Sequence, residues 1–176
     1  CSPQRVAALL ESARPDIAAL QEIDARPTRR LSIDPFGYFA QRLGGKTLAA
    51  RTMLRQEGHY GHILISRWPL ESLGDEDLSM PRSEPRRALV GAVEAPFGRL
   101  NVVAAHLGLS WLERRRQIAL LERRIAELAG TELLLLGDFN DSRRRGLTER
   151  RLCPPLRPTP ALRTFPSRWP LLPLDR

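Results

Sequence analysis

The spacing of apolar residues near the start of the chain predicts a helix followed by a buried strand. Residues 2–3, a serine followed by a proline, are typical of a helix N-terminus. An apolar face at helical spacing continues until Arg14, where a proline follows. The short apolar run "DIAALQEID", residues 16–24, predicts a buried strand that ends at Gln21 and Glu22. This order of elements indicates a layered α/β domain.

The middle of the chain changes from helical to strand-like patterning. Residues 25–35 contain prolines and scattered arginines and are expected to form a loop. Residues 36–45, "FGYFAQRLGG", predict a short helix closed by glycine. Three stretches rich in β-branched and apolar residues then follow without a helix between them, at 60–69, 86–95 and 99–108. A "PFG" turn separates the last two, so we expect them to form a hairpin.

The second half contains the clearest helix signal in the chain. Ser110, with Glu113 three residues later, is typical of a capping box. Apolar residues continue at a helical period until Gly130, where the helix is expected to end. The run "ELLLLGDF", residues 132–139, predicts a buried strand. After Arg150 the chain is rich in proline, so we expect an extended tail that packs on the body.

Composition adds constraints on the number of domains and on the compartment. A chain of 176 residues with 42% hydrophobic content is long enough for one domain with a sizeable core. It contains no apolar run long enough to span a membrane and no visible leader. Two isolated cysteines, Cys1 and Cys153, form neither a disulfide framework nor a metal cluster. We therefore expect a cytoplasmic location; the sequence leaves the oligomeric state open.

The net charge of +8 comes from arginine, because Lys46 is the only lysine. Such a surplus could bind nucleic acid or another polyanion. It could equally be spread over solvated faces, and the interleaving of arginines with glutamates favours this second interpretation. Two basic runs, residues 114–116 and 143–145, are the candidates for contact with a nucleic-acid backbone.

Polar side chains stand at the ends of strands that are otherwise apolar. Asp138 and Asn140 close the strand "LLLLG", and alternation along a strand would direct both to one side while Phe139 points into the core. Glu22 and His106 close two other strands in the same way. A buried acid is costly unless it is solvated, paired or bound to a cation. Taken together, these groups indicate a site for a metal-bound water or a phosphate.

The chain resembles the endonuclease/exonuclease/phosphatase superfamily of DNase I-like, Mg²⁺-dependent phosphoesterases. The resemblance implies an α/β (α+β) fold, a two-sheet β-sandwich flanked by helices in four α/β/β/α layers. It rests on six blocks in the family's order: "PDIAALQE" at 15–22, "YGHILISRWP" at 60–69, "EPRRAL" at 84–89, "AAHLGLSWLERRRQ" at 104–117, "LLLGDFN" at 134–140 and "FPSRWPLLPLDR" at 165–176.

Carried over residue by residue, the resemblance implies a set of catalytic roles. Glu22 would be a ligand of Mg²⁺, with Mn²⁺ as the alternative ion, and His106 would lie near the scissile phosphate. Asp138 would orient or deprotonate the attacking water, and Asn140 would hydrogen-bond the phosphoryl oxygens. Mg²⁺ suits this chemistry because it needs only one or two carboxylates beside the substrate's oxygens.

The resemblance also implies supporting residues. Tyr60 and Arg86 stand where the family places phosphate-contacting groups. Asp175 corresponds to the aspartate that hydrogen-bonds the catalytic histidine and fixes its tautomer. His62 occupies a position where relatives commonly have asparagine. Either it reflects a different substrate, or the imidazole replaces the amide as donor and acceptor.

The family's early asparagine strand and its late "SDH" segment are not found in the sequence. We therefore expect residues 1–176 to be a single truncated domain, incomplete at both ends and inactive by itself. Two functions remain open. One is a phosphoesterase that hydrolyses phosphodiester or phosphomonoester bonds by in-line attack of water. The other is a non-catalytic member that binds phosphate-bearing ligands. The partner is a phosphate ester, with nucleic acid as one candidate; DNA, RNA, inositol phosphates and lipid head groups stay open.

Overall fold

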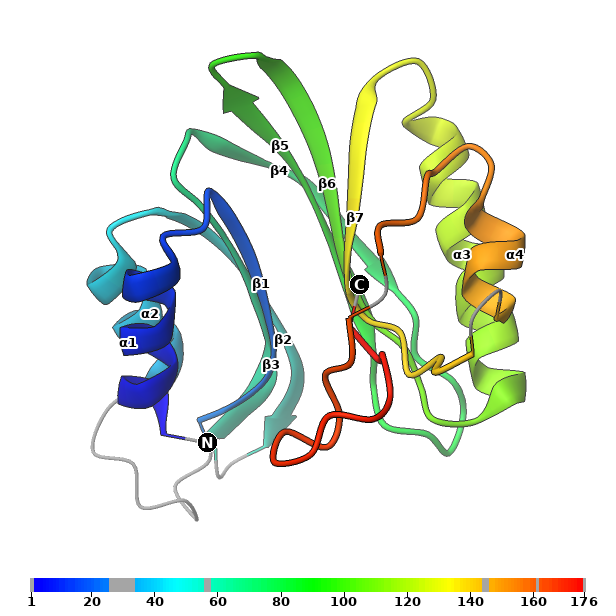
Figure 1. The fold of residues 1–176 in the computed structure, drawn as a ribbon, viewed down its shortest axis with the longest axis horizontal. Coiled ribbons are helices and arrows are strands. Elements are labelled where there is room, and N and C mark those ends of the chain that lie inside the picture. Colours follow the sequence, from blue (N-terminus) through cyan, green and yellow to red (C-terminus); the bar gives the residue numbers. More distant parts are fainter. Residues whose placement is uncertain (1, 26–33, 56–57, 144–145, 161, 176) are drawn as a thin grey trace.

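The computed structural model describes residues 2–25, 34–55, 58–143, 146–160 and 162–175, and two β-sheets form its centre (Figure 1). The first sheet has the strand order β1-β3-β2, and all its neighbours are antiparallel. Its strands are β1 (Ile17–Asp24), β2 (Lys46–Arg55) and β3 (Gly58–Ser66). Helices α1 (Pro3–Ala13) and α2 (Pro35–Leu43) cover its outer face (Figure 1).

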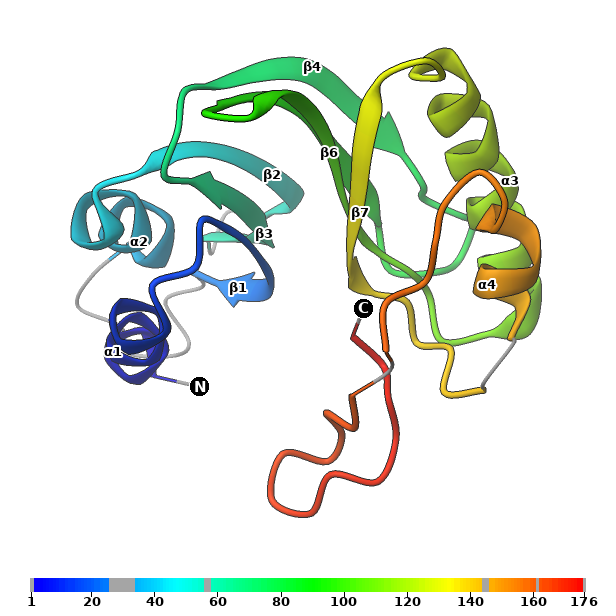
Figure 2. The same cartoon turned by 45° about the horizontal axis from the view of Figure 1, so that its top comes forward.

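The second sheet has the strand order β4-β5-β6-β7. Its strands are β4 (Leu70–Asp77), β5 (Arg87–Ala95), β6 (Gly98–His106) and β7 (Glu132–Asp138). Strands β5 and β6 form an antiparallel hairpin, whereas β6 and β7 are parallel and are joined by helix α3 (Trp111–Glu127). A parallel pair needs such a crossover, so the C-terminal ends of β6 and β7 come to lie side by side. Helix α4 (Leu147–Leu152) packs beside α3 on the outer face (Figure 2).

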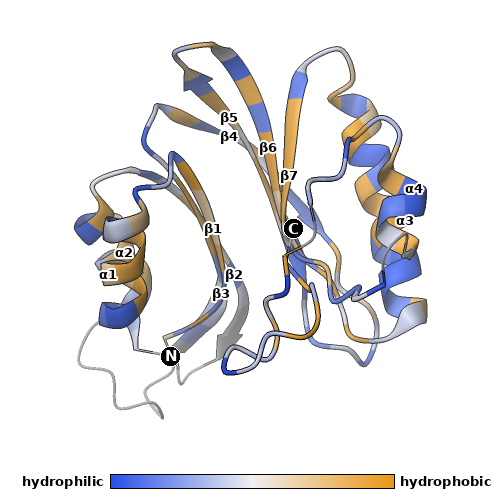
Figure 3. Cartoon of the chain, in the orientation of Figure 1, coloured by the Kyte–Doolittle hydropathy of each residue, from blue (hydrophilic) through white to orange (hydrophobic). Residues whose placement is uncertain are grey.

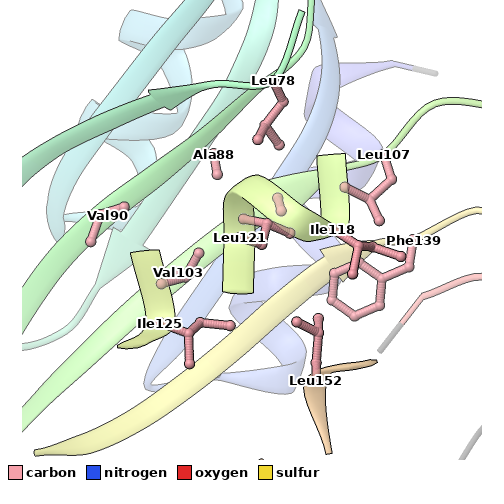
Figure 4. Packing of buried hydrophobic residues seen from close by; sticks show 11 residues of the cluster. Leu78, Ala88, Val90, Val103, Leu107, Ile118, Leu121, Ile125, Phe139 and Leu152 are labelled. Carbon is pink, nitrogen blue, oxygen red and sulfur yellow. The ribbon is translucent and has the colours of Figure 1, made fainter. Parts of the chain in front are cut away.

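Three apolar clusters hold these layers together. Between the sheets, the core contains Leu64, Val93 and Val102, which are fully buried. A second cluster, including Phe36 and Phe39, joins α1 and α2 to the first sheet. A third joins α3 and α4 to the second sheet through residues that include those drawn in Figure 4: Leu78, Ala88, Val90, Val103, Leu107, Ile118, Leu121, Ile125, Phe139 and Leu152. The predicted α/β/β/α arrangement of a two-sheet sandwich flanked by helices is confirmed. Figure 3 colours most of β7 and much of β5 and β6 as hydrophobic.

Most of the elements expected from periodicity are present at the expected places. Helix α1 ends at Ala13, with Arg14 in the left-handed conformation, and α2 is closed by Gly44 in the same conformation. The side chain of Ser110 accepts a hydrogen bond from the backbone N–H of Glu113, as a capping residue does. Helix α3 ends at Glu127, three residues before the predicted glycine. The loop expected at residues 25–35 lies largely outside the described residues.

Three elements were not predicted. Strand β4 is an edge strand; most of its residues are exposed and half of them are acidic, so its sequence carries little apolar alternation. Strand β2 is an edge strand of the first sheet. Its sequence, "KTLAARTMLR", contains polar and small residues that obscure the two-residue alternation of a strand. Helix α4 has six residues, too few to show a helical period. After α4 the tail is extended, as predicted, with isolated bridges rather than regular strands.

Gly137 allows β7 to reach its neighbour closely just before Asp138. Its φ is +148°, and a Cβ atom at this position would overlap the carbonyl oxygen of Ala105 in β6. A side chain here would therefore force the two parallel strands apart at the end that carries His106 and Asp138. The absence of a side chain at Gly137 is thus needed for His106 and Asp138 to lie side by side.

We expect Gly137→Ala to lower the free energy of unfolding more than a glycine replacement elsewhere that introduces backbone strain but no steric overlap. Gly74 in β4 is the matched control: its φ is +97°, and no atom lies within 4 Å of the position of a Cβ. Gly74→Ala should cost about 1 kcal/mol, and Gly137→Ala about 1–3 kcal/mol more because of the overlap with β6. Urea unfolding of the two variants measures the difference, and equal losses would contradict this account of β7.

Candidate functional site

The ends of β1, β6 and β7 lie at one end of the sandwich, where the two sheets approach each other (Figures 1 and 2). Glu22, His106 and Asp138 come from these three strand ends. Register pairs His106 with Asp138, and the Nε2 atom of His106 lies 3.8 Å from Oδ2 of Asp138. Burial raises the pKa of Asp138, and the nearby carboxylates of Asp175 and Glu22 raise it further. The structure therefore brings together the strand-end groups singled out in the sequence.

Glu22 occupies an irregular, strained point of β1. The pairing of β1 with β3 shifts register between Leu20 and Ile23, and Glu22 has a φ of +57°. Such a bulge changes the direction of a side chain, and bulges are common beside active sites. Glu22 is exposed at this point and is hydrogen-bonded to Tyr60 of β3. Burial raises the pKa of Tyr60, and the charges of Glu22 and Glu84 add to the effect, so the phenol stays protonated.

Asn140 lies beyond the end of β7, so the alternation of side chains along a strand does not explain its position at the site. Strand β7 ends at Asp138, and Asn140 lies beyond it with a φ of +49°. Its backbone N–H donates to Oδ1 of Asp138 at 2.9 Å, and its side-chain Nδ2 donates to the carbonyl oxygen of Leu107 at 2.8 Å. Phe139 is buried, as expected. The prediction that Asp138 and Asn140 share one region is thus correct, but its reason, continued alternation, is wrong.

Arg86 and His106 form the buried polar centre of the site. The guanidinium of Arg86 is 6% exposed; its Nη1 lies 2.8 Å from Nδ1 of His106, and its Nη2 donates to Glu84 at 3.0 Å. Arginine can only donate, so Nδ1 of His106 accepts, and the imidazole proton is on Nε2, on the side of Asp138. Burial, followed by the charge of Arg86, lowers the pKa of His106 to about 3. His106 is therefore a neutral hydrogen-bond donor at neutral pH.

His62 lies beside the same guanidinium. It is buried in β3, and burial together with the Arg86 charge lowers its pKa to about 4. Among the residues that the structure describes, the Nε2 of His62 and the Nε of Arg86 are buried polar atoms without a hydrogen-bond partner. Buried polar atoms of this kind are costly unless a water or a ligand satisfies them. The site thus retains hydrogen-bonding capacity that the protein itself does not use.

Asp175 lies against Asp138, because the two residues form an antiparallel bridge. The backbone N–H of Phe139 donates to the carbonyl oxygen of Leu174, which fixes this end of the tail beside β7. Among the described residues, the contact that fixes the tautomer of His106 comes from Arg86. The role expected for Asp175, as hydrogen-bond partner of the catalytic histidine, stays a prediction.

Gln117 of α3 is a supporting residue that the sequence reasoning missed. It is fully buried; its Oε1 accepts from the N–H of Gly108 at 2.8 Å, and its Nε2 donates to the carbonyl of Leu78 at 3.0 Å. These contacts join the segment after His106 to the segment that precedes Arg86. A signal was available: Gln117 precedes Leu121 and Ile125 at four-residue intervals, so it is a polar residue on the apolar face of a helix.

Three carboxylates at the site provide oxygen ligands of the kind that a hard divalent cation prefers. Three carboxylates, from Glu22, Asp138 and Asp175, lie near one another, and the pKa of Asp138 is raised in part by the other two. A cation among oxygen donors relieves such repulsion, and Mg²⁺ requires only one or two protein carboxylates. Within the described ranges, however, no three histidine, cysteine, aspartate or glutamate side chains are arranged to enclose a metal ion.

The two-sheet sandwich with its flanking helices, and the polar groups at the ends of β1, β6 and β7, define a class of α/β proteins with a polar site at the strand ends. The sequence profile of the Endonuclease/Exonuclease/phosphatase family matches residues 1–176, and the chain belongs to this family. It is 32% identical to the uncharacterized protein YbhP of Escherichia coli K12, over 92% of this chain and 70% of that protein.

Two solved structures show the same fold. The mannosyl-6-phosphatase Bt3783 of Bacteroides thetaiotaomicron matches with a TM-score of 0.65 and 16% identity, over 85% of this chain and 60% of that chain. The human Nocturnin catalytic domain, with a bound sulfate anion, matches with a TM-score of 0.65 and 18% identity, over 84% of this chain and 59% of that chain. The chain therefore spans about three fifths of either solved structure. In the part of the chain described, no helix is long and apolar enough to cross a membrane.

The buried histidines predict a pH-dependent stability. An unfolded histidine takes up a proton near pH 6.5, whereas folded His62 and His106 resist it until about pH 4 and 3. Their contribution is complete above pH 6.5 and is lost as the pH falls towards the folded values. Between pH 7 and 5, the free energy of unfolding should fall by about 2 kcal/mol for each histidine.

Urea unfolding of the wild type and of His62→Asn at both pH values tests this. The variant should lose about half of the pH dependence, because His106 retains its share. The raised pKa of Asp138 acts in both proteins and cancels in the comparison. A wild type with equal stability at pH 7 and 5 would show that the histidines are not held neutral.

Proposed function

We propose that this protein is a metal-dependent phosphoesterase that hydrolyses a phosphate ester by in-line attack of water. The observation that carries the proposal is the convergence of Glu22, Arg86, His106, Asp138 and Asn140 at one end of the sandwich. Hydrolysis of a phosphate ester needs positioning of the water and stabilisation of charge on the phosphoryl oxygens. Membership of the Endonuclease/Exonuclease/phosphatase family supports this chemistry.

The cationic and neutral donors would bind the phosphate. The Nη1 of Arg86 is directed at His106, so its charge acts next to the imidazole that donates from Nε2. Nδ2 of Asn140 has a second N–H beyond the one given to Leu107, and this proton is available to a phosphoryl oxygen. Tyr60, kept protonated by burial and by Glu22, gives its single hydroxyl proton to that carboxylate and would act on the phosphate only through Glu22. The other three groups, Arg86, His106 and Asn140, would stabilise negative charge on a phosphoryl group.

Asp138 would act on the attacking water. Its Oδ1 accepts from the backbone N–H of Asn140, which fixes the carboxyl group, and Oδ2 faces the protonated Nε2 of His106. Its raised pKa makes the carboxylate a better proton acceptor than a solvated aspartate. Asp175, bridged to the same backbone, adds negative charge that favours proton uptake by Asp138. Asp138 is thereby suited to orient a water and to accept its proton.

Glu22 is the residue that would hold Mg²⁺ or Mn²⁺, at the exposed bulge of β1. A divalent cation bound there supplies charge neutralisation for the phosphoryl oxygens. The bulge directs the carboxylate outward, and Tyr60 fixes its orientation by a hydrogen bond. One carboxylate is sufficient for such an ion because substrate oxygens and waters provide its other ligands.

The alternative, a phosphate-binding member without turnover, is favoured by one observation. Across the described residues, no three potential metal-ligating side chains form an enclosed metal site. Arg86, His62 and His106 could still hold a phosphate without hydrolysing it. Turnover of bis-p-nitrophenyl phosphate or p-nitrophenyl phosphate by the whole protein, rather than by residues 1–176 alone, and dependent on added Mg²⁺, distinguishes the two functions. Phosphate binding with no turnover of either ester supports the alternative.

Replacement of the site residues should abolish turnover. Asp138→Ala and Asn140→Ala should each lower kcat by about 100-fold or more, because positioned acid–base and charge-stabilising groups contribute factors of this size. The hydrolysis of the two p-nitrophenyl esters measures the loss. Activity that survives both replacements would show that the site lies elsewhere.

The strained position of Glu22 permits a sharper test. Glycine adopts a positive φ without strain, so Glu22→Gly should raise the free energy of unfolding by about 0.5–1 kcal/mol. The same variant should lose Mg²⁺-dependent turnover. Arg14→Gly is the matched control, because Arg14 also has a positive φ, +47°, at the end of α1 away from the site. It should gain similar stability and keep its turnover; a Glu22→Gly variant that keeps its Mg²⁺ dependence would contradict the proposed metal ligand.

A further inference from the structure

The tail forms a hairpin that projects from the body beside the site (Figures 1 and 2). Phe165 and Leu172 form an antiparallel bridge, and backbone hydrogen bonds of 2.8–3.0 Å join them in both directions. The N–H of Trp169 donates to the carbonyl of Pro166, which closes the tip. The base is fixed by Leu174, whose carbonyl accepts from Phe139 and whose N–H donates to the hydroxyl of Thr164. We call residues 162–174 the site hairpin.

The site hairpin exposes large apolar side chains together with arginines. Trp169 is 72% exposed and Leu171 63%, and Leu162, Phe165 and Leu172 are exposed as well. Arg163 and Arg168 are exposed on the same hairpin, and residues 162–174 contain no acid. An exposed apolar group of this size is uncommon on a protein surface and indicates an interaction site. The partner must accept apolar insertion and carry negative charge.

A second apolar group lies at the same end of the sandwich. The segment 109–112, which includes the start of α3, exposes Leu109, Trp111 and Leu112, and the guanidinium of Arg115 lies 5.5 Å from the centre of the Trp111 ring. The segment follows His106 by three residues, and the base of the site hairpin is bridged to Asp138. Both groups therefore extend from the two strand ends that carry the candidate catalytic residues (Figure 2).

We propose that the site hairpin and the first turn of α3 dock onto the surface of a membrane that contains anionic phospholipids. This inference rests on the proposed function, because it gives that site a phosphate ester at a membrane surface as its substrate class. Tryptophan and leucine enter the boundary between head groups and acyl chains, while arginines bind the lipid phosphates. The site would then lie over the head groups.

The chemistry of the surface favours a membrane over nucleic acid or a second copy of the chain. Single-stranded nucleic acid stacks its bases on aromatic rings, yet much of the exposed area here belongs to leucines, on which bases do not stack. A second copy would bring the same arginines face to face, and the site hairpin offers no acid to pair with them. Acyl chains accept leucine and tryptophan alike, and anionic head groups neutralise Arg163 and Arg168.

Co-sedimentation with vesicles tests this docking, with EDTA present so that turnover plays no part. The purified protein should bind vesicles of phosphatidylcholine mixed with phosphatidylglycerol, and bind phosphatidylcholine alone more weakly. Trp169→Ser combined with Leu171→Ser should weaken binding by about tenfold or more, because two large apolar side chains no longer insert. Arg163→Gln combined with Arg168→Gln should weaken binding to the anionic vesicles by about 25-fold, about fivefold for each charge.

Matched replacements on α1 serve as controls. Leu9 is 68% exposed and Arg5 is exposed on the same helix, so Leu9→Ser and Arg5→Gln remove similar groups away from the site hairpin. Both should bind vesicles as the wild type does, and all variants should unfold at the same urea concentration. Binding that falls equally in the α1 variants would overturn the proposal, as would no binding to anionic vesicles.

Two further measurements test whether the site hairpin binds nucleic acid or a second copy of the chain instead of a membrane. Trp169-dependent binding of a single-stranded oligonucleotide, or a dimer in solution that Trp169→Ser dissociates, would each overturn docking on a membrane. Because the vesicle assay needs no turnover, it can fail while hydrolysis of a soluble p-nitrophenyl ester is intact, and the reverse. A failure of the docking and a failure of the phosphoesterase are thus distinguishable.

Discussion

A buried guanidinium determines the arrangement of the site. Arg86 is almost completely removed from solvent, and a charge in such a place is tolerated only when it is paired and hydrogen-bonded. Glu84 supplies the opposite charge, and His106 supplies an acceptor. The second contact fixes the tautomer of His106 and contributes to its low pKa. Burial is the main reason that both His62 and His106 stay neutral, and the Arg86 charge lowers the pKa of both further.

The pairing of Arg86 depends on backbone segments that come from distant parts of the sequence. The carbonyl of Arg86 accepts from the N–H of Leu78, and the carbonyl of Leu78 accepts from Gln117 of α3. Gln117 also holds Gly108, next to the carbonyl of Leu107 that accepts from Asn140. These hydrogen bonds connect α3 to the loops after β4, β6 and β7. The positions of the groups that we propose bind phosphate are therefore a property of the packed second sheet and of α3, rather than of any single loop.

Strain is concentrated where the chemistry is proposed. Among the described residues, four non-glycine positions have a positive φ, and Glu22 and Asn140 are two of them. This conformation costs Glu22 about 1–2 kcal/mol relative to a relaxed backbone, whereas asparagine adopts it more readily. A third, Arg14, closes α1, where a left-handed residue is usual. No helix end explains Glu22 or Asn140. Stability given up at these positions is consistent with a requirement on the direction of their side chains.

The sequence predicted those features of the fold that depend on local patterns. The 3.6-residue period and the caps around Ser110 and Gly44 located the helices, and continuous apolar runs located β1, β3 and β5–β7. Strands β2 and β4 were missed because neither contains a continuous apolar run: half of the residues of β4 are acidic, and polar and small residues interrupt β2. The candidate site was found as a set of residue types at strand ends. Its hydrogen bonds were not found: the contact between Arg86 and His106 joins residues 20 positions apart in sequence, and the bulge at Glu22 arises from pairing with β3.

The arginines of the outer faces differ in their surroundings from the two arginines of the site hairpin. On the outer faces, arginines pair with acids of neighbouring elements, as Arg42 does with Glu11 and Arg151 with Glu122. Such exposed pairs contribute about 0–1 kcal/mol each and neutralise the charge locally. This agrees with the interpretation that interleaved charges cover solvated faces. The acid-free site hairpin is different, because Arg163 and Arg168 stand there among exposed apolar side chains. Two of the positive charges thus lie on the site hairpin, beside the strand ends where we propose that a phosphate is bound.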